Sequence, residues 1–105
     1  MNILAVTACP SGVAHTYMSA EALETKCKAR GWSVKVETQG SIGIENRITP
    51  EDVAAADAVI LTTDMPIKEE ERFKGKMIAR VGIGDAIKKT DAILNKIEAA
   101  YKNKK

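Results

Sequence analysis

The sequence predicts an α/β protein built on an open, doubly wound sheet of four parallel strands, with helices on both faces. Two observations predict this fold class. Apolar, strand-like runs alternate with segments of helical periodicity, in the order β-α-β-α-β-turn-β-α. The chain has 105 residues, which is enough for one hydrophobic core and too few for two, so we expect residues 1–105 to form a single domain.

The first part of the chain predicts a buried strand, a loop and a helix. Residues 2–7 are an apolar run, and the following residues 8–12 contain proline and glycine, which favour a loop. Residues 15–30 are rich in helix formers, and Cys27 falls on their apolar face, so we expect its thiol in the core. Gly31 is a natural residue to end this helix.

The middle of the chain predicts a second strand and a short helix. Residues 32–38 alternate between apolar and polar, which is typical of a strand with one wetter face near a sheet edge. Residues 39–43 end it, and we expect them to line the site or contact a partner. The next helix, residues 50–56, begins with Thr49 as N-cap and Asp52 in the capping-box position.

The last part predicts two more strands and a final helix. Residues 58–63 are a second unbroken apolar run, and Asp64 after it is expected to cap a turn. Residues 68–73 indicate a charged turn or helical turn, and the mixed charges of residues 68–72 indicate a solvated surface. Residues 76–81 then form the fourth strand, and residues 85–101 show the spacing of one helix.

This order of elements implies right-handed crossovers and a three-layer arrangement of the Rossmann-like or flavodoxin-like kind. In such sheets ligands bind outside the carboxyl ends of the strands, where the strand order reverses. The loops that we expect at that edge span residues 8–14, 39–46 and 64–68.

The composition excludes several classes of protein. A net charge of +2 argues against a nucleic-acid partner. The two cysteines fit neither a disulfide framework nor a zinc site, so we expect no metal. No apolar run approaches the roughly 20 residues that span a bilayer, and the first residues lack the basic region of a signal peptide. We therefore expect a cytoplasmic protein.

The first loop carries the chemistry, because Cys9 sits between a strand end and a helix start. The backbone N–H groups and the dipole of a helix N-terminus favour a thiolate, and they would also hold a phosphoryl group on its sulfur. Gly12 lets the backbone turn closely, and Ser11 can donate a hydrogen bond. His15 is a candidate for assistance by proton or charge, and Tyr17 and Met18 for an apolar docking rim.

The nearest alternative is a small cysteine phosphatase or an arsenate-reductase-like enzyme. Cysteine phosphatases place an arginine six residues after the cysteine to grip the phosphate. Here that position is His15, and no arginine or lysine lies between Cys9 and Glu21. Such a loop suits a phosphoryl group delivered by a docked donor better than one captured from solution. A regulatory module that senses phosphorylation is the other alternative.

Residues 9–23, CPSGVAHTYMSAEAL, resemble the signature of the fructose-type enzyme IIB component of the bacterial phosphoenolpyruvate-dependent sugar phosphotransferase system. The resemblance continues through residues 34–64, VKVETQGSIGIENRITPEDVAAADAVILTTD, and residues 71–76, ERFKGK. One departure is Ser11, where the family more often has threonine, and a hydroxyl is retained.

The resemblance implies a protein-N(π)-phosphohistidine–sugar phosphotransferase component without a cofactor. Cys9 would accept a phosphoryl group from phosphohistidine of the IIA component and pass it to a sugar, usually fructose, held by the membrane IIC component. With no span in this chain, IIC would be a separate protein, and IIB would associate through it with the inner face of the membrane. The resemblance carries the phosphate-binding loop onto Pro10, Ser11, Gly12, Val13, Ala14, His15 and Thr16.

Overall fold

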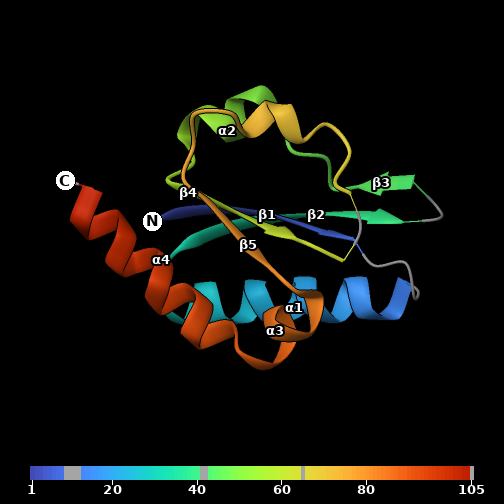
Figure 1. The fold of residues 1–105 in the computed structure, drawn as a ribbon, viewed down its shortest axis with the longest axis horizontal. Coiled ribbons are helices and arrows are strands. Elements are labelled where there is room, and N and C mark those ends of the chain that lie inside the picture. Colours follow the sequence, from blue (N-terminus) through green and yellow to red (C-terminus); the bar gives the residue numbers. More distant parts are fainter. Residues whose placement is uncertain (9–12, 41–42, 65, 105) are drawn as a thin grey trace.

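The computed structural model describes residues 1–8, 13–40, 43–64 and 66–104 (Figure 1). Strands and helices alternate through most of the chain, as the sequence predicts. In chain order the elements are β1 (Asn2–Ala8), α1 (Val13–Ala29), β2 (Ser33–Gly40), β3 (Gly43–Glu45), α2 (Pro50–Ala55), β4 (Ala58–Thr62), the 3₁₀ helix η1 (Glu70–Phe73), β5 (Ile78–Val81), α3 (Ile83–Lys88) and α4 (Thr90–Lys104).

The described strands form one sheet in the order β3-β2-β1-β4-β5. The four predicted strands, β1, β2, β4 and β5, are parallel, which confirms the open doubly wound fold. The predicted count of four strands is wrong by one, because β3 adds to β2 as an antiparallel edge strand. Asn46 ends β3 in the left-handed region at φ 55°, and its side-chain amide donates a hydrogen bond to Val36 O at 2.9 Å.

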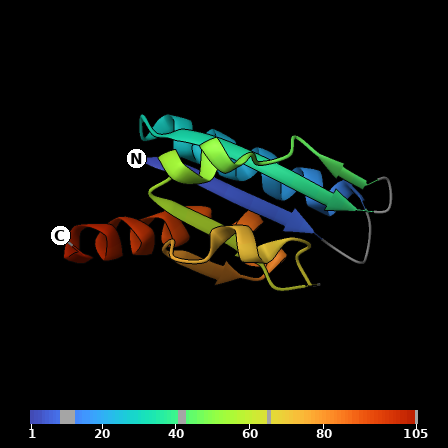
Figure 2. The same ribbon diagram turned by 90° about the horizontal axis from the view of Figure 1, so that it is seen from above.

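The sheet separates two apolar layers (Figures 1 and 2). Helices α1, α3 and α4 cover one face, and α2 with η1 covers the other. Alternate residues of β1 supply both layers, because successive side chains of a strand point to opposite faces. Ile3 and Ala5 join the cluster that includes Leu23 of α1, whereas Leu4 and Val6 join the cluster that includes Phe73 of η1.

The helix ends follow the predicted signals in two cases. Gly31 lies after α1 at φ 77°, a backbone conformation that glycine adopts without strain. Thr49 caps α2 in a complete capping box: its side chain accepts from Asp52 N at 3.2 Å, and Asp52 Oδ2 accepts from Thr49 N at 3.0 Å. Helix α1 begins at Val13, two residues before the predicted start at residue 15.

The predicted single helix over residues 85–101 is wrong, because the chain forms two helices, α3 and α4. Lys89 between them has φ −119° and ψ 33°, outside the helical region. Thr90 then donates its side-chain hydroxyl to Ala86 O, the carbonyl that a continuous helix would pair with the backbone N–H of Thr90. A local side-chain contact therefore replaces a backbone bond at the break.

Candidate functional site

The end of β1 and the start of α1 lie at the end of the molecule to which the parallel strands point (Figures 1 and 2). The predicted phosphate-loop residues between them lie outside the described residues; these are Cys9, Pro10, Ser11 and Gly12. The other predicted loop residues form the first turn of α1 instead: Val13, Ala14, His15 and Thr16. The start of α1 therefore brings to this edge of the sheet the positive end of a helix, with backbone N–H groups that have no partner within the helix.

Ala8, the residue before Cys9, is held by a side chain of the neighbouring strand. Its N–H donates to Thr62 Oγ1 at 3.0 Å, and the same hydroxyl donates to Ala8 O at 3.3 Å. Both residues are buried. On its other side Ala8 is in register with Gln39 of β2. The chain entering the predicted loop is thus fixed between β2 and β4, where the strand order reverses.

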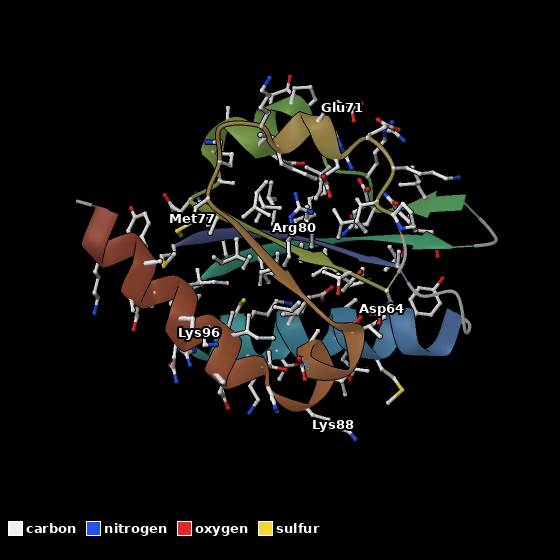
Figure 3. All side chains as sticks on the ribbon, viewed as in Figure 1. Asp64, Glu71, Met77, Arg80, Lys88 and Lys96 are labelled. Atoms are coloured by element: carbon white, nitrogen blue, oxygen red, sulfur yellow. The ribbon has the colours of Figure 1, made fainter. Side chains whose placement is uncertain are left out.

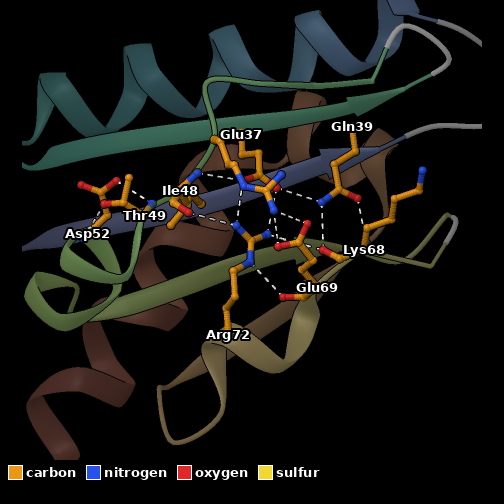
Figure 4. Close-up of polar contacts among 9 residues, drawn as sticks. Glu37, Gln39, Ile48, Thr49, Asp52, Lys68, Glu69 and Arg72 are labelled. Carbon is orange, nitrogen blue, oxygen red and sulfur yellow. Dashed lines mark hydrogen bonds and ion pairs between the residues drawn. The ribbon is translucent and has the colours of Figure 1, made fainter.

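An ion pair joins Glu37 of the neighbouring strand β2 to Arg72 of η1 (Figure 4). The carboxylate of Glu37 is fully buried and accepts two hydrogen bonds at 2.9 Å from the guanidinium of Arg72, one on each oxygen. It also accepts from Ile48 N and from Gln39 Nε2, both at 2.8 Å. Burial acts to raise the pKa of Glu37, but these donors outweigh it and hold the pKa below its usual value.

The same network fixes the segment that follows β4. Gln39 accepts from Lys68 N at 2.8 Å and donates to Lys68 O at 3.1 Å, so its side-chain amide pairs with a backbone as a strand would. Arg72 gives its remaining N–H groups to the backbone carbonyls of Ile48, Lys68 and Glu69. The prediction that residues 68–72 form a solvated surface is therefore wrong for Arg72, whose side chain is 16% exposed.

Asp64 is predicted to cap a turn, and the structure instead shows its carboxylate at the start of a helix. It lies beyond the end of β4, beside α3 (Figure 3), and its carboxylate accepts from Ile83 N at 2.5 Å, at the start of α3. Gly82 is the N-cap residue of the same helix. Asp64 and Gly82 thus both contribute to the start of α3.

Tyr17 and Met18 are the exposed large hydrophobic residues in the part of the chain whose burial the structure gives, at 42% and 51%. Both belong to the first half of α1, near the predicted loop. The Tyr17 hydroxyl donates to Glu45 of β3, and this hydrogen bond raises the pKa of Tyr17. The two side chains fit the predicted apolar rim, and their role in docking stays a prediction.

Cys27 is a core residue, as predicted. Its side chain is fully buried beside Ala20 and Leu23. Burial raises the pKa of the Cys27 thiol to about 11, so it is protonated near neutral pH. A protonated, enclosed thiol is a poor nucleophile, so Cys27 is unsuited to covalent chemistry.

Sequence reasoning missed Thr62, Glu37 and Arg72 as parts of this edge. Thr62 closes an apolar run, and its hydroxyl could have been noticed as a polar group at a strand end. Glu37 fits the polar positions of an alternating strand equally well whether it meets water or a partner. Its partner comes 35 residues later, and no spacing rule links the two.

The chain matches known proteins over nearly its whole length. Residues 4–96 match the family described as "PTS system, Lactose/Cellobiose specific IIB subunit". Over 98 residues the chain is 72% identical to the PTS system fructose-like EIIB component 2 of Escherichia coli (strain K12), covering 93% of this chain and 92% of that protein. It is 56% identical over 98 residues to the PTS system fructose-specific EIIB'BC component of the same strain, covering 93% of this chain and 17% of that protein.

Solved structures of similar proteins have the same fold. A predicted fructose-specific IIB from Escherichia coli superposes with a TM-score of 0.90 at 39% identity, covering 95% of this chain and 88% of that one. A domain of the fructose-specific IIABC component of the PTS system from Borrelia burgdorferi gives a TM-score of 0.87 at 49% identity, covering 91% of each chain. These matches confirm the resemblance drawn from the sequence. The chain therefore belongs to the IIB family of the sugar phosphotransferase system, among its fructose-type members.

Proposed function

We propose that this IIB component carries a phosphoryl group on Cys9, taking it from phosphohistidine of a IIA component and passing it to a sugar. The arrangement of β1 and α1 carries the proposal. Both the carboxyl end of β1 and the N-terminus of α1 lie at the same edge of the sheet, and in the sequence Cys9 is the residue directly after β1. Cys27, the other cysteine of the chain, is buried and protonated.

The first step is an exchange of bonds at phosphorus. The Cys9 thiolate attacks, the S–P bond forms, the N–P bond breaks, and the histidine nitrogen leaves with the electron pair. Backbone N–H groups at the start of α1, with residues 10–16 as the phosphate loop, stabilise the charge on the phosphoryl oxygens. His15 is the candidate for assistance by proton or charge.

The second step returns Cys9 to the thiolate. A sugar hydroxyl attacks phosphorus, the O–P bond forms, and the S–P bond breaks, while the hydroxyl proton goes to a base on the component that holds the sugar. Relatives named EIIB'BC and EIIBC join B and C components in one chain, which supports a membrane IIC as the partner here. Within the described ranges, no helix combines the length and the apolar composition that a bilayer crossing needs.

The names of the relatives support fructose, or a fructose-like sugar, as the acceptor. The family description names lactose and cellobiose instead. We favour a fructose-like sugar because both individual relatives, 72% and 56% identical to this chain, carry fructose in their names. On this proposal IIB works at the inner face of the membrane, where IIC presents the sugar.

Intact-protein mass spectrometry tests the phosphocarrier role. Incubation with a phosphorylated IIA component is expected to add the mass of one phosphoryl group to the wild type and none to Cys9→Ser. Cys27→Ser is the matched control, because it removes the other thiol while the site stays intact. Addition of IIC membranes and fructose should then remove the label and yield sugar phosphate. Labelling that survives in Cys9→Ser would refute the assignment.

A further inference from the structure

We propose that Thr62 is a positioning residue for phosphoryl transfer, acting through Ala8 on the cysteine that follows it. The proposal rests on the phosphocarrier function proposed above. Thr62 touches neither donor nor sugar in this scheme. The Thr62 hydroxyl holds Ala8, the last residue of β1, and Cys9 is the next residue in the sequence.

The pairing of β1 with β4 stops short of the strand end. The last paired residues are Val6 and Leu61, two residues before the end of β1. Beyond them the Thr62 side chain supplies both hydrogen bonds to Ala8, accepting from its N–H at 3.0 Å and donating to its carbonyl at 3.3 Å. A threonine hydroxyl can do both at once, since it carries one donor and two lone pairs.

The contact is enclosed, so water is poorly placed to replace it. Ala8 is fully buried and Thr62 is 2% exposed. Consecutive Cα atoms are about 3.8 Å apart, so a change in the position or direction of Ala8 passes directly to the next residue. Transfer between two proteins needs the sulfur in line with the breaking N–P bond, and a misplacement of about 1 Å can cost roughly a hundredfold in rate.

Three substitutions separate positioning from general stability. Thr62→Val keeps the shape and removes the hydroxyl, whereas Thr62→Ser keeps the hydroxyl. Thr63→Val is the matched control at the neighbouring position, because the Thr63 hydroxyl donates to Val81 O of β5 and faces away from β1. If Thr62→Val does not fold, Thr62→Ala takes its place, since it removes the hydroxyl with a smaller side chain.

Single-turnover transfer from phosphorylated IIA is the first measurement, made well below the melting temperature of each variant. We expect Thr62→Val to slow transfer by about tenfold to a hundredfold, with Thr62→Ser within about threefold of the wild type. Thr63→Val should transfer at the wild-type rate. Equal rates for Thr62→Val and the wild type, or a loss of rate shared by Thr63→Val, would overturn the proposal.

The second measurement does not depend on transfer. The pH profile of iodoacetamide alkylation at Cys9, followed in a Cys27→Ser background, reports the pKa of the thiol. Thr62→Val should move the profile to higher pH and Thr62→Ser should restore it, whereas a variant that is merely less stable keeps the wild-type profile. An unchanged pH profile in Thr62→Val would refute a positioning role for Thr62. Failure of the wild type to gain a phosphoryl group at Cys9 would instead refute the phosphocarrier function.

Discussion

Replacing Arg72 with methionine should strongly destabilise the fold. Arg72 supplies two of the four hydrogen bonds that Glu37 accepts from described residues, and it supplies the positive charge. Glu37 is fully buried and Arg72 is 16% exposed, so water screens the pair little. Removing one partner of such a pair costs about 3–5 kcal/mol, because the other charge stays buried. For a domain of this size that lowers the melting temperature by roughly 15 °C or more.

The free energy of unfolding should depend on pH differently in Arg72→Met and in the wild type. In the wild type the pKa of Glu37 lies below its unfolded value of 4.5, so its contribution is complete above that value and is lost as the pH falls. Without Arg72, we expect burial to outweigh the remaining donors and to raise the pKa of Glu37 above its ordinary value. The free energy of unfolding of Arg72→Met should then increase as the pH falls from about 7 towards 5, since protonation relieves the buried charge.

Urea denaturation of four proteins measures the effect: wild type, Arg72→Met, Glu37→Gln and the double variant. Glu37→Gln/Arg72→Met should be more stable than Arg72→Met, because a neutral glutamine still accepts from Ile48 N and leaves no buried charge. A coupling free energy of about 2 kcal/mol is expected from this cycle. A cost below about 1 kcal/mol for Arg72→Met, with the pH slope of the wild type, would refute the reasoning.

Three further predictions concern single side chains. Cys27 should resist iodoacetamide in the folded protein at about pH 8 and react after unfolding; rapid labelling of the native state would contradict its enclosure and its pKa of about 11. Thr49→Ala should lower the free energy of unfolding by about 1 kcal/mol through loss of the α2 cap, and Thr49→Ser should restore it. Met18→Glu should raise the KM for phosphorylated IIA by about tenfold with the melting temperature unchanged, whereas Ala92→Glu on α4 should leave transfer as it is; equal KM values would remove Met18 from the docking surface.

Local patterns predicted most of the fold. The apolar runs of β1 and β4 and the capping box of α2 are signals within a few residues, and all three were read correctly. The edge strand β3 has only three residues and is fixed by its pairing with β2, so it carries no pattern of its own. The break between α3 and α4 comes at Lys89 and Thr90, and residues 85–101 contain no glycine or proline to signal it.

The site was predicted less completely than the fold, for a physical reason. The sequence predicts Cys9 from a local signal, a thiol between a strand and a helix start, and its role stays a prediction. Arg72 and Thr62 act on residues that lie 35 and 54 positions away in the sequence, and they meet them only across the folded sheet. Their side chains alone suit a solvated turn or an ordinary strand end equally well.

The central place of β1 has a consequence for biosynthesis. The ribosome makes this strand first, yet its two neighbours emerge later, β2 with residues 33–40 and β4 with residues 58–62. Until β4 emerges, one edge of β1 has no strand partner, and the apolar side chains on both of its faces lack the cover that later elements supply. Nascent chains arrested before residue 58 should therefore be protease-sensitive and prone to bind chaperones, and protection should be complete only once α4 (Thr90–Lys104) has cleared the exit tunnel.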